Sequence, residues 1–252
     1  MQLQEQINQF FDKIFVICLE RNFEKQKDKL FRNLAGVNYE IFWAIDGKAL
    51  PKDDLSSLYN APEAQKELYS FMRLRYNTNV HRDLNLSEIG CSLSHISIYK
   101  RIAELNLDKV LILEEDAVIN PNFGLDFNGY VQNIPAQYDL IYWGYRWHDC
   151  ETKLARLKRQ ITNILTLRLG HNKRYPSRYN RWFSFAGMHA GTHAYSVSAK
   201  FARELVGGNM PVKFNADHFL ISKTFLSQKR CFVCIPKLFI NDSSHISTLV
   251  NG

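Results

Sequence analysis

The sequence lacks several features that would place the protein in a membrane or outside the cell. It has no apolar run of the roughly 20 residues that a transmembrane helix requires. Its first segment, MQLQEQINQF, has neither the basic start nor the apolar core of a secretory signal peptide. Cysteine is scarce, with five scattered residues among 252. An odd number of scattered cysteines favours free thiols in a reducing compartment, so we expect a cytoplasmic protein.

Linkers and internal repeats are also absent from the sequence. No stretch rich in glycine, serine and proline separates one part of the chain from another. The chain is 46% hydrophobic and 13% aromatic, which is enough to bury a core. A length of 252 residues fits one large domain or two small ones. With no visible boundary, we predict a single domain over residues 1–252.

Acidic residues are missing from one long stretch, residues 152–203, although the whole chain has a net charge of only +7. Within it, KLARLKRQITNILTLRLG places aliphatic residues at helical spacing with basic residues between them: Leu154, Leu157, Ile161, Ile164 and Leu165. This pattern predicts a cationic amphipathic helix in a basic insertion at about residues 152–182. Such a helix can lie on an anionic membrane or bind an acidic partner, or it can pack on the core with its basic face in water.

Short apolar runs alternate with helical patterns along the chain. Strands are predicted at residues 13–19, 39–45, 109–113, 139–144, 193–198 and 231–236. Helices are predicted at about residues 23–34 and 85–105, and Asn85 with Glu88 forms a capping-box pattern at the start of the second helix. This order predicts an α/β protein with a mostly parallel sheet flanked by helices.

Three carboxylates, Glu114, Glu115 and Asp116, follow the apolar strand 109–113 directly. Arg21 follows the first strand, and Asp46 with Gly47 follows the second. Ligands of open α/β sheets bind at the carboxyl ends of the strands, so these groups are expected to converge. Close carboxylates repel each other unless a cation neutralises them, and oxygen ligands suit Mg²⁺ or Mn²⁺. The alternative is a solvated turn whose acids face water.

The helix at residues 85–105 carries further candidates. Glu88, Cys91 and His95 fall on one helical face. Gly90 lets a ligand or another backbone approach closely. A hydrogen-bonded core histidine is the alternative interpretation of His95.

Several ordered motifs resemble glycosyltransferase family 25, whose members build bacterial lipooligosaccharide and whose relatives modify collagen hydroxylysine. The resemblance extends over most of the chain and is carried by SEIGCSLSH, VLILEEDAVI, VICLERN, FWAIDGKAL, AGTHAYSVS, PVKFNADHFL and NDSSHIST. It implies a GT-A-like fold and transfer, with inversion, of a hexose from a UDP-sugar, most commonly galactose. The family more often has Asp where Glu20 and Glu115 stand, and an Arg near Lys25 and Lys27.

The resemblance also implies roles for individual residues. A divalent metal, Mn²⁺ or Mg²⁺, would be bound by Glu114, Asp116 and His245. The nucleotide sugar would contact Leu19, Arg21, Asp46, Gly47, Gly90, Ser94, His95, Glu114 and Glu115.

For the base that activates the acceptor hydroxyl, Asp217 is the first candidate and Glu88 the second. Asp217 could instead be an ordinary acid in the first turn of a helix, and His245 a surface histidine. Tyr145, Trp147 and His193 are candidates for acceptor binding, although the two aromatic residues could equally belong to a core strand.

The sequence also leads to expectations about binding partners and leaves alternative functions open. A lipooligosaccharide acceptor is anionic and membrane-bound, so the basic insertion would hold the protein at the cytoplasmic face of a bacterial inner membrane. Nucleic acid is not an expected partner, because no motif for binding it is present and the positive charge is confined to one stretch. The rival functions are a metal-dependent phosphohydrolase, a protein that binds anionic polymers and a non-catalytic scaffold.

Overall fold

The computed structural model describes residues 2–51, 55–60, 66, 83–123, 127–146, 153–170, 174–226 and 229–242. The helices among them are α1 (Leu3–Phe10), α2 (Glu20–Asn33), the 3-10 helix η1 (Gly47–Ala49), α3 (Leu55–Leu58), α5 (Leu86–Leu105), α6 (Phe127–Asn133), α7 (Lys153–Arg168), α8 (Ala199–Val206) and α9 (Ala216–Leu226). The strands are β1 (Lys13–Cys18), β2 (Glu40–Trp43), β3 (Val110–Glu114), β4 (Ala117–Ile119), β5 (Leu140–Arg146), β6 (Ser177–Arg178), β7 (Phe183–Phe185), β8 (Ala190–Val197), β9 (Cys231–Cys234) and β10 (Phe239–Asn241).

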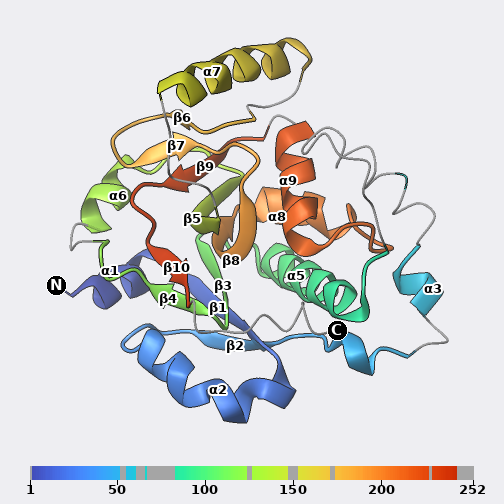
Figure 1. The fold of residues 1–252 in the computed structure, drawn as a ribbon. Helices are drawn as coiled ribbons and strands as arrows, with labels where there is room; N and C mark the ends of the chain where they lie inside the picture. Colours follow the sequence, from blue (N-terminus) through green and yellow to red (C-terminus); the bar gives the residue numbers. More distant parts are fainter. Residues whose placement is uncertain are drawn as a thin grey trace.

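Eight of these strands form one twisted sheet in the order β2-β1-β3-β8-β5-β9-β7-β6 (Figure 1). The pairs β1–β2, β1–β3 and β5–β9 are parallel, whereas β8 is antiparallel to β3 and β5, and β7 is antiparallel to β9 and β6. Six strands therefore point one way, and β7 and β8 point the other way. This confirms the predicted α/β fold with a mostly parallel sheet, which is compatible with a GT-A-like architecture.

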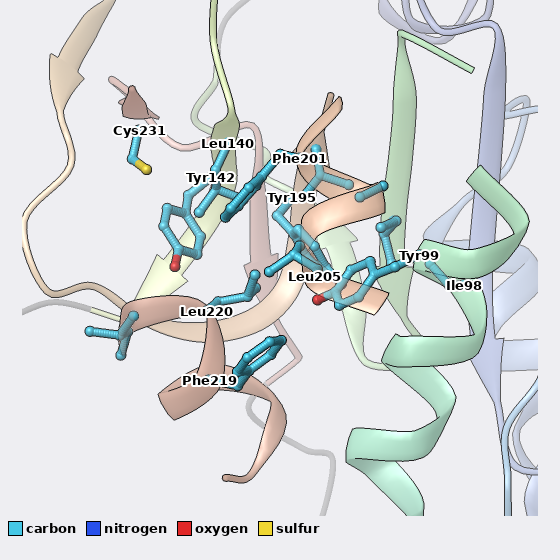
Figure 2. Packing of buried hydrophobic residues seen from close by; sticks show 14 of the residues in the cluster. Ile98, Tyr99, Leu140, Tyr142, Tyr195, Phe201, Leu205, Phe219, Leu220 and Cys231 are labelled. Carbon is cyan, nitrogen blue, oxygen red and sulfur yellow. The ribbon is translucent and has the colours of Figure 1, made fainter. Parts of the chain in front are cut away.

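Helices cover both faces of the sheet, as the apolar runs of its central strands require. Along β3, Val110 and Ile112 join one buried cluster, while Leu111 and Leu113 join a second cluster on the opposite face. The first cluster contains side chains of α5, α8 and α9, and the second contains side chains of α1, α2 and α6. Figure 2 shows the first cluster, where residues of the three helices pack on Leu140, Tyr142 and Tyr195 of the sheet.

Helix α5 begins with the predicted capping box. The Glu88 amide donates to Asn85 Oδ1 at 2.9 Å, and the Asn85 amide donates to Glu88 Oε2 at 3.0 Å. Its Gly90 lies against the backbone of the 45–47 segment, where a β-carbon would be only 2.4 Å from the Gly47 nitrogen. This glycine therefore allows α5 to pack tightly on the segment that follows β2.

The basic insertion contains the predicted helix, α7, which lies beside the β6–β7 end of the sheet and far from β2 (Figure 1). Among the residues that the structure describes, no helix is both long and apolar enough to span a bilayer.

Candidate active site

A cavity of about 370 Å³ opens at the ends of β1 and β3, with α5, β8 and the start of α9 forming its walls. This volume suits a small-molecule ligand. The residues predicted from the sequence that line the cavity are Leu19, Arg21, Asp46, Gly47, Glu88, Ser94, His95, Glu114, Glu115, Asp116, His193 and Asp217. The fold therefore brings together residues from six separate sequence motifs.

Glu114, the last residue of β3, is held by two neighbours. The Thr192 hydroxyl donates a hydrogen bond to Glu114 Oε1, and His95 Nε2 lies 3.5 Å from the same oxygen. Burial by itself raises the pKa of Glu114, but the interactions with His95 and Thr192 outweigh burial and lower that pKa below its usual value. The Glu114 carboxylate is therefore ionised and fixed in position.

His95 is itself fixed from behind. Its Nδ1 lies 2.7 Å from the Tyr195 hydroxyl, which lies 2.9 Å from the Tyr99 hydroxyl. The His95 side chain is 2% exposed. His95 is thus a hydrogen-bonded core histidine that also lies beside the cavity carboxylate, and its contact with the donor stays a prediction.

Glu115 has a different environment from Glu114. Its Oε2 accepts a hydrogen bond from the Leu19 amide at 3.4 Å. Burial raises the pKa of Glu115 to about 7, helped by the charges of Asp116 and Glu114 and opposed by the Leu19 hydrogen bond and Arg21. Adjacent carboxyl groups in the sequence therefore differ sharply in their tendency to ionise.

One wall of the cavity is built from the segments that follow β1 and β2. Arg21 Nε contacts Asp46 Oδ2 at 3.1 Å, and Asp46 Oδ1 also accepts from the Lys48 amide at 3.0 Å. Ser94 Oγ accepts from the Ile45 amide at 2.8 Å and donates to the Gly90 carbonyl at 2.7 Å. Arg21 and Asp46 thus offer charge to a ligand, whereas Ser94 is occupied in joining α5 to this wall. Gly90 does not line the cavity.

Cys91 lines the same cavity as the carboxylates of Glu114, Asp217 and Glu88. Burial raises the pKa of Cys91, and the charges of Glu114, Asp217 and Glu88 raise it further. Glu88 is engaged in the capping box of α5, whereas Asp217 lies in the first turn of α9, next to Asn215, which caps that helix through the His218 amide at 3.2 Å. Of the two candidate bases, Glu88 uses its carboxylate to cap α5, whereas Asn215, and not Asp217, caps α9.

Of the three candidates for acceptor binding, the structure places only His193 at the cavity among those it describes. His193 is 2% exposed and lines the cavity. Burial lowers the pKa of His193, and the charges of Arg146 and Lys237 help to bring it to about 4. Tyr145 does not line the cavity, because its hydroxyl donates to the Cys234 carbonyl at 3.4 Å and its ring lies under Lys237 Nζ at 4.5 Å. Trp147 and His245 lie outside the described residues.

Comparison with known proteins agrees with the motifs that meet in this cavity. The family model described as Glycosyltransferase family 25 (LPS biosynthesis protein) matches residues 11–220. The chain belongs to glycosyltransferase family 25.

Three relatives, all from animals, resemble parts of this chain. A glycosyltransferase 25 family member of Drosophila pseudoobscura pseudoobscura is 36% identical over 137 residues, which is 53% of this chain and 20% of the relative. Human procollagen galactosyltransferase 2 is 29% identical over 204 residues, 79% of this chain and 28% of the relative. The rat protein named "Probable inactive glycosyltransferase 25 family member 3" is 26% identical over 151 residues, 58% of this chain and 24% of the relative.

The chain spans less than a third of the length of each of these relatives. A solved structure from STIV covers 93% of this chain and 96% of its own, but at 12% identity and a TM-score of 0.38 it carries no argument. Family membership is therefore established by sequence, and the activity of this chain is inferred from its own site.

Some lining residues of this family 25 site were not picked out from the sequence: Arg146, Gly191, Thr192, Asn215, Asn241 and Asp242. Gly191, Thr192, Asn215, Asn241 and Asp242 fall inside or beside the AGTHAYSVS, PVKFNADHFL and NDSSHIST motifs, so the motifs contained a usable signal. Arg146 ends β5 and had no such signal.

Whether this chain can hold a divalent metal depends on its carboxylates. Glu114 Oε1 already accepts from the Thr192 hydroxyl and lies beside His95 Nε2. Asp116 Oδ2 accepts from Asn241 Nδ2 at 2.8 Å. Across the part of the chain that the structure describes, no three acidic, histidine or cysteine side chains converge as metal ligands. Mg²⁺ is commonly bound by one or two carboxylates together with substrate phosphates. The described residues therefore fit a cation shared with a diphosphate, rather than a closed protein site.

Proposed function

We propose that this chain transfers a hexose, galactose, from a UDP-sugar to a hydroxyl group of a glycan acceptor, with inversion at the anomeric carbon. The observation that carries the proposal is the cavity itself. It joins a fixed, ionised Glu114 and the Asp217 carboxylate to the Arg21–Asp46 pair, in a chain of glycosyltransferase family 25.

The reaction is a single displacement. The acceptor oxygen forms a bond to the anomeric carbon as the bond from that carbon to the diphosphate oxygen breaks, and the bonding electron pair leaves with the diphosphate. Asp217 takes the proton of the acceptor hydroxyl, because it is a cavity carboxylate that is not engaged in a capping box. Glu88 instead ties its carboxylate to the start of α5.

The donor lies along the wall formed by the ends of β1 and β2. Arg21, held by Asp46 at 3.1 Å, offers positive charge to the diphosphate, and the Leu19 segment lies beside Glu115. Glu114 and Asp116 would hold a divalent cation, Mn²⁺ or Mg²⁺, which would neutralise negative charge on the leaving diphosphate.

The proposed acceptor is a lipooligosaccharide, in keeping with the family description as an LPS biosynthesis protein. Such an acceptor would place the chain at the cytoplasmic face of a bacterial inner membrane. The name of human procollagen galactosyltransferase 2 supports a second acceptor, a procollagen peptide, in which the family resemblance implies hydroxylysine as the modified residue. Both acceptors present a hydroxyl group, so the same proton transfer to Asp217 serves either.

The test incubates the purified chain with Mn²⁺ and a panel of UDP-sugars, with lipooligosaccharide, with a hydroxylysine-containing peptide or with no acceptor. We expect UDP release that depends on an acceptor, with a gain of one hexose on the lipooligosaccharide by mass spectrometry. Asp217→Asn serves as the matched inactive control.

Two results would overturn the proposal. Release of UMP and hexose 1-phosphate without any acceptor identifies a phosphohydrolase, because such an enzyme cleaves a phosphorus–oxygen bond of the donor. No transfer from any donor to either acceptor by the folded protein identifies a non-catalytic scaffold or a protein that binds anionic polymers. Transfer to the peptide alone replaces the proposed acceptor with the second one.

A further inference from the structure

Helix α7 exposes an apolar stripe to water. Leu157, Ile161, Ile164 and Leu165 are 54%, 51%, 52% and 53% exposed. Their spacing of four, three and one places them on a single face of the helix. The packing interpretation made from the sequence, in which this stripe faces the core, is therefore wrong for these four side chains.

The opposite face of α7 attaches the helix to the protein. The buried Asn163 side chain donates from Nδ2 to the Tyr175 carbonyl at 3.0 Å and accepts from the Tyr175 amide at 2.8 Å. The Arg159 guanidinium lies 5.1 Å from the centre of the Tyr175 ring. A surface helix usually turns its apolar stripe to the core and its polar side chains to water. Polar contacts hold α7 instead, so the apolar stripe remains available to a partner.

The charge around this stripe is of one sign. Lys158 and Arg168 are exposed on α7, and Arg178 and Arg181 are exposed in the adjoining β6 segment. The sequence has no Asp or Glu from residue 152 to residue 203. Two copies of this face would repel each other. An anionic lipid surface satisfies both features, because headgroups attract the basic side chains while the acyl region accepts the apolar ones.

We propose that α7 lies in the interface of an anionic lipid bilayer, with its apolar stripe toward the acyl chains and Lys158 and Arg168 at the headgroups. The inference rests on α7 and not on the proposed reaction, since none of the described α7 residues lines the cavity. The position of α7 beyond β6 leaves its outer side open in Figure 1.

The experiment measures co-sedimentation of the full chain with vesicles of phosphatidylcholine alone or mixed with phosphatidylglycerol. One variant replaces the stripe (Leu157→Gln, Ile161→Gln, Ile164→Gln, Leu165→Gln), and another reverses charge (Lys158→Glu, Arg168→Glu). A matched control reverses two exposed lysines outside α7 (Lys100→Glu, Lys200→Glu). Circular dichroism and thermal unfolding check that each variant is folded.

We expect the unaltered chain to bind the mixed vesicles and not the neutral ones. The charge variant should lose affinity by about tenfold or more, because Glu side chains are repelled by the anionic headgroups. The stripe variant should lose affinity by a similar factor, because Gln side chains do not enter the acyl region as Leu and Ile do. The control should bind as the unaltered chain does. Hydrogen exchange of the unaltered chain adds a measurement that needs no variant, and α7 should become protected when mixed vesicles are added.

Three outcomes would overturn the proposal. The unaltered chain could fail to bind the mixed vesicles, or the stripe variant could bind them as tightly as the unaltered chain. Sedimentation velocity could also show self-association that the stripe variant abolishes, in which case a second copy covers the stripe. Sugar transfer is not the readout in any of these measurements, so failure of the proposed reaction would be seen separately.

Discussion

The Nδ1 atom of His95 lies 2.7 Å from the hydroxyl oxygen of Tyr195, and this hydrogen bond joins helix α5 to strand β8. Through it, the SEIGCSLSH and AGTHAYSVS motifs meet behind the Glu114 carboxylate. Tyr195 does not line the cavity, so we expect it to act through His95, by positioning that side chain.

Replacing Tyr195 with Phe should lower kcat by on the order of tenfold while leaving the KM for the UDP-sugar nearly unchanged. The loss leaves the buried His95 Nδ1 without its partner, which costs about 1–3 kcal/mol of folding free energy. Steady-state kinetics and urea unfolding measure the two effects. Tyr99→Phe, one hydrogen bond further from Glu114, is the control and should affect kcat less. Equal kcat values for Tyr195→Phe and the unaltered chain would contradict the positioning role.

Replacing Gly90 with Ala should destabilise the fold. The added β-carbon would lie 2.4 Å from the Gly47 nitrogen and 2.7 Å from the Ile45 carbonyl oxygen, both backbone atoms that cannot move independently. Overpacking of this kind typically costs about 1–3 kcal/mol. Urea unfolding measures the change. Gly207→Ala is the matched control, because no atom lies within 4 Å of its β-carbon position and its φ of −86° suits alanine. If both variants have the same free energy of unfolding, the close contact at Gly90 does not contribute to stability.

Asp217→Asn and Glu88→Gln should separate catalysis from capping. Removing a general base lowers kcat by about 10²- to 10⁴-fold, so we expect a loss of that size for Asp217→Asn with donor binding retained. Glu88→Gln should lower stability by less than about 1 kcal/mol, because glutamine still accepts from the Asn85 amide in the capping box of α5 and only the negative charge at the helix N-terminus is lost. Rate assays and thermal unfolding on both variants give the answer. The reverse pattern, with Glu88→Gln inactive and Asp217→Asn active, would make Glu88 the base.

Binding of Mn²⁺ should depend on the nucleotide. Because no three potential protein ligands converge among the described residues, the cation needs phosphate oxygens to complete its coordination. Calorimetric titration should show weak Mn²⁺ binding to the chain alone and tighter binding with UDP present, and Asp116→Ala should abolish the gain. Removing the metal with a chelator should lower the rate of transfer. Tight binding of Mn²⁺ without UDP would show a closed protein site instead.

Local patterns identified much of the fold. Six predicted strands correspond to β1, β2, β3, β5, β8 and β9, because each is a run of apolar residues long enough to give a signal. The short strands β4, β6, β7 and β10, of two or three residues each, were missed. Strands of that length contain too few residues to show periodicity, and they form only because a neighbouring strand supplies hydrogen-bond partners.

Some features of the candidate site could be predicted from local sequence patterns, and others could not. The acids Glu114, Glu115 and Asp116 could be placed at a strand end, since strand 109–113 ends there by its own pattern. That Glu114 and Glu115 have opposite pKa shifts could not be predicted, because the cause lies in Thr192, His95 and the Leu19 amide. Thr192 is 78 residues away from Glu114 in the sequence.

By itself, the sequence determined the apolar strands, the capping box of α5, the acids at the end of β3, the amphipathic character of α7 and the motifs of family 25. Each depends on residues close together in the chain. The tertiary structure alone decided that β8 runs antiparallel to β3, that His95 contacts both Tyr195 and Glu114, and that the stripe of α7 faces water. These depend on which distant segments meet, and the free energy of those contacts is set by the whole fold rather than by local propensity.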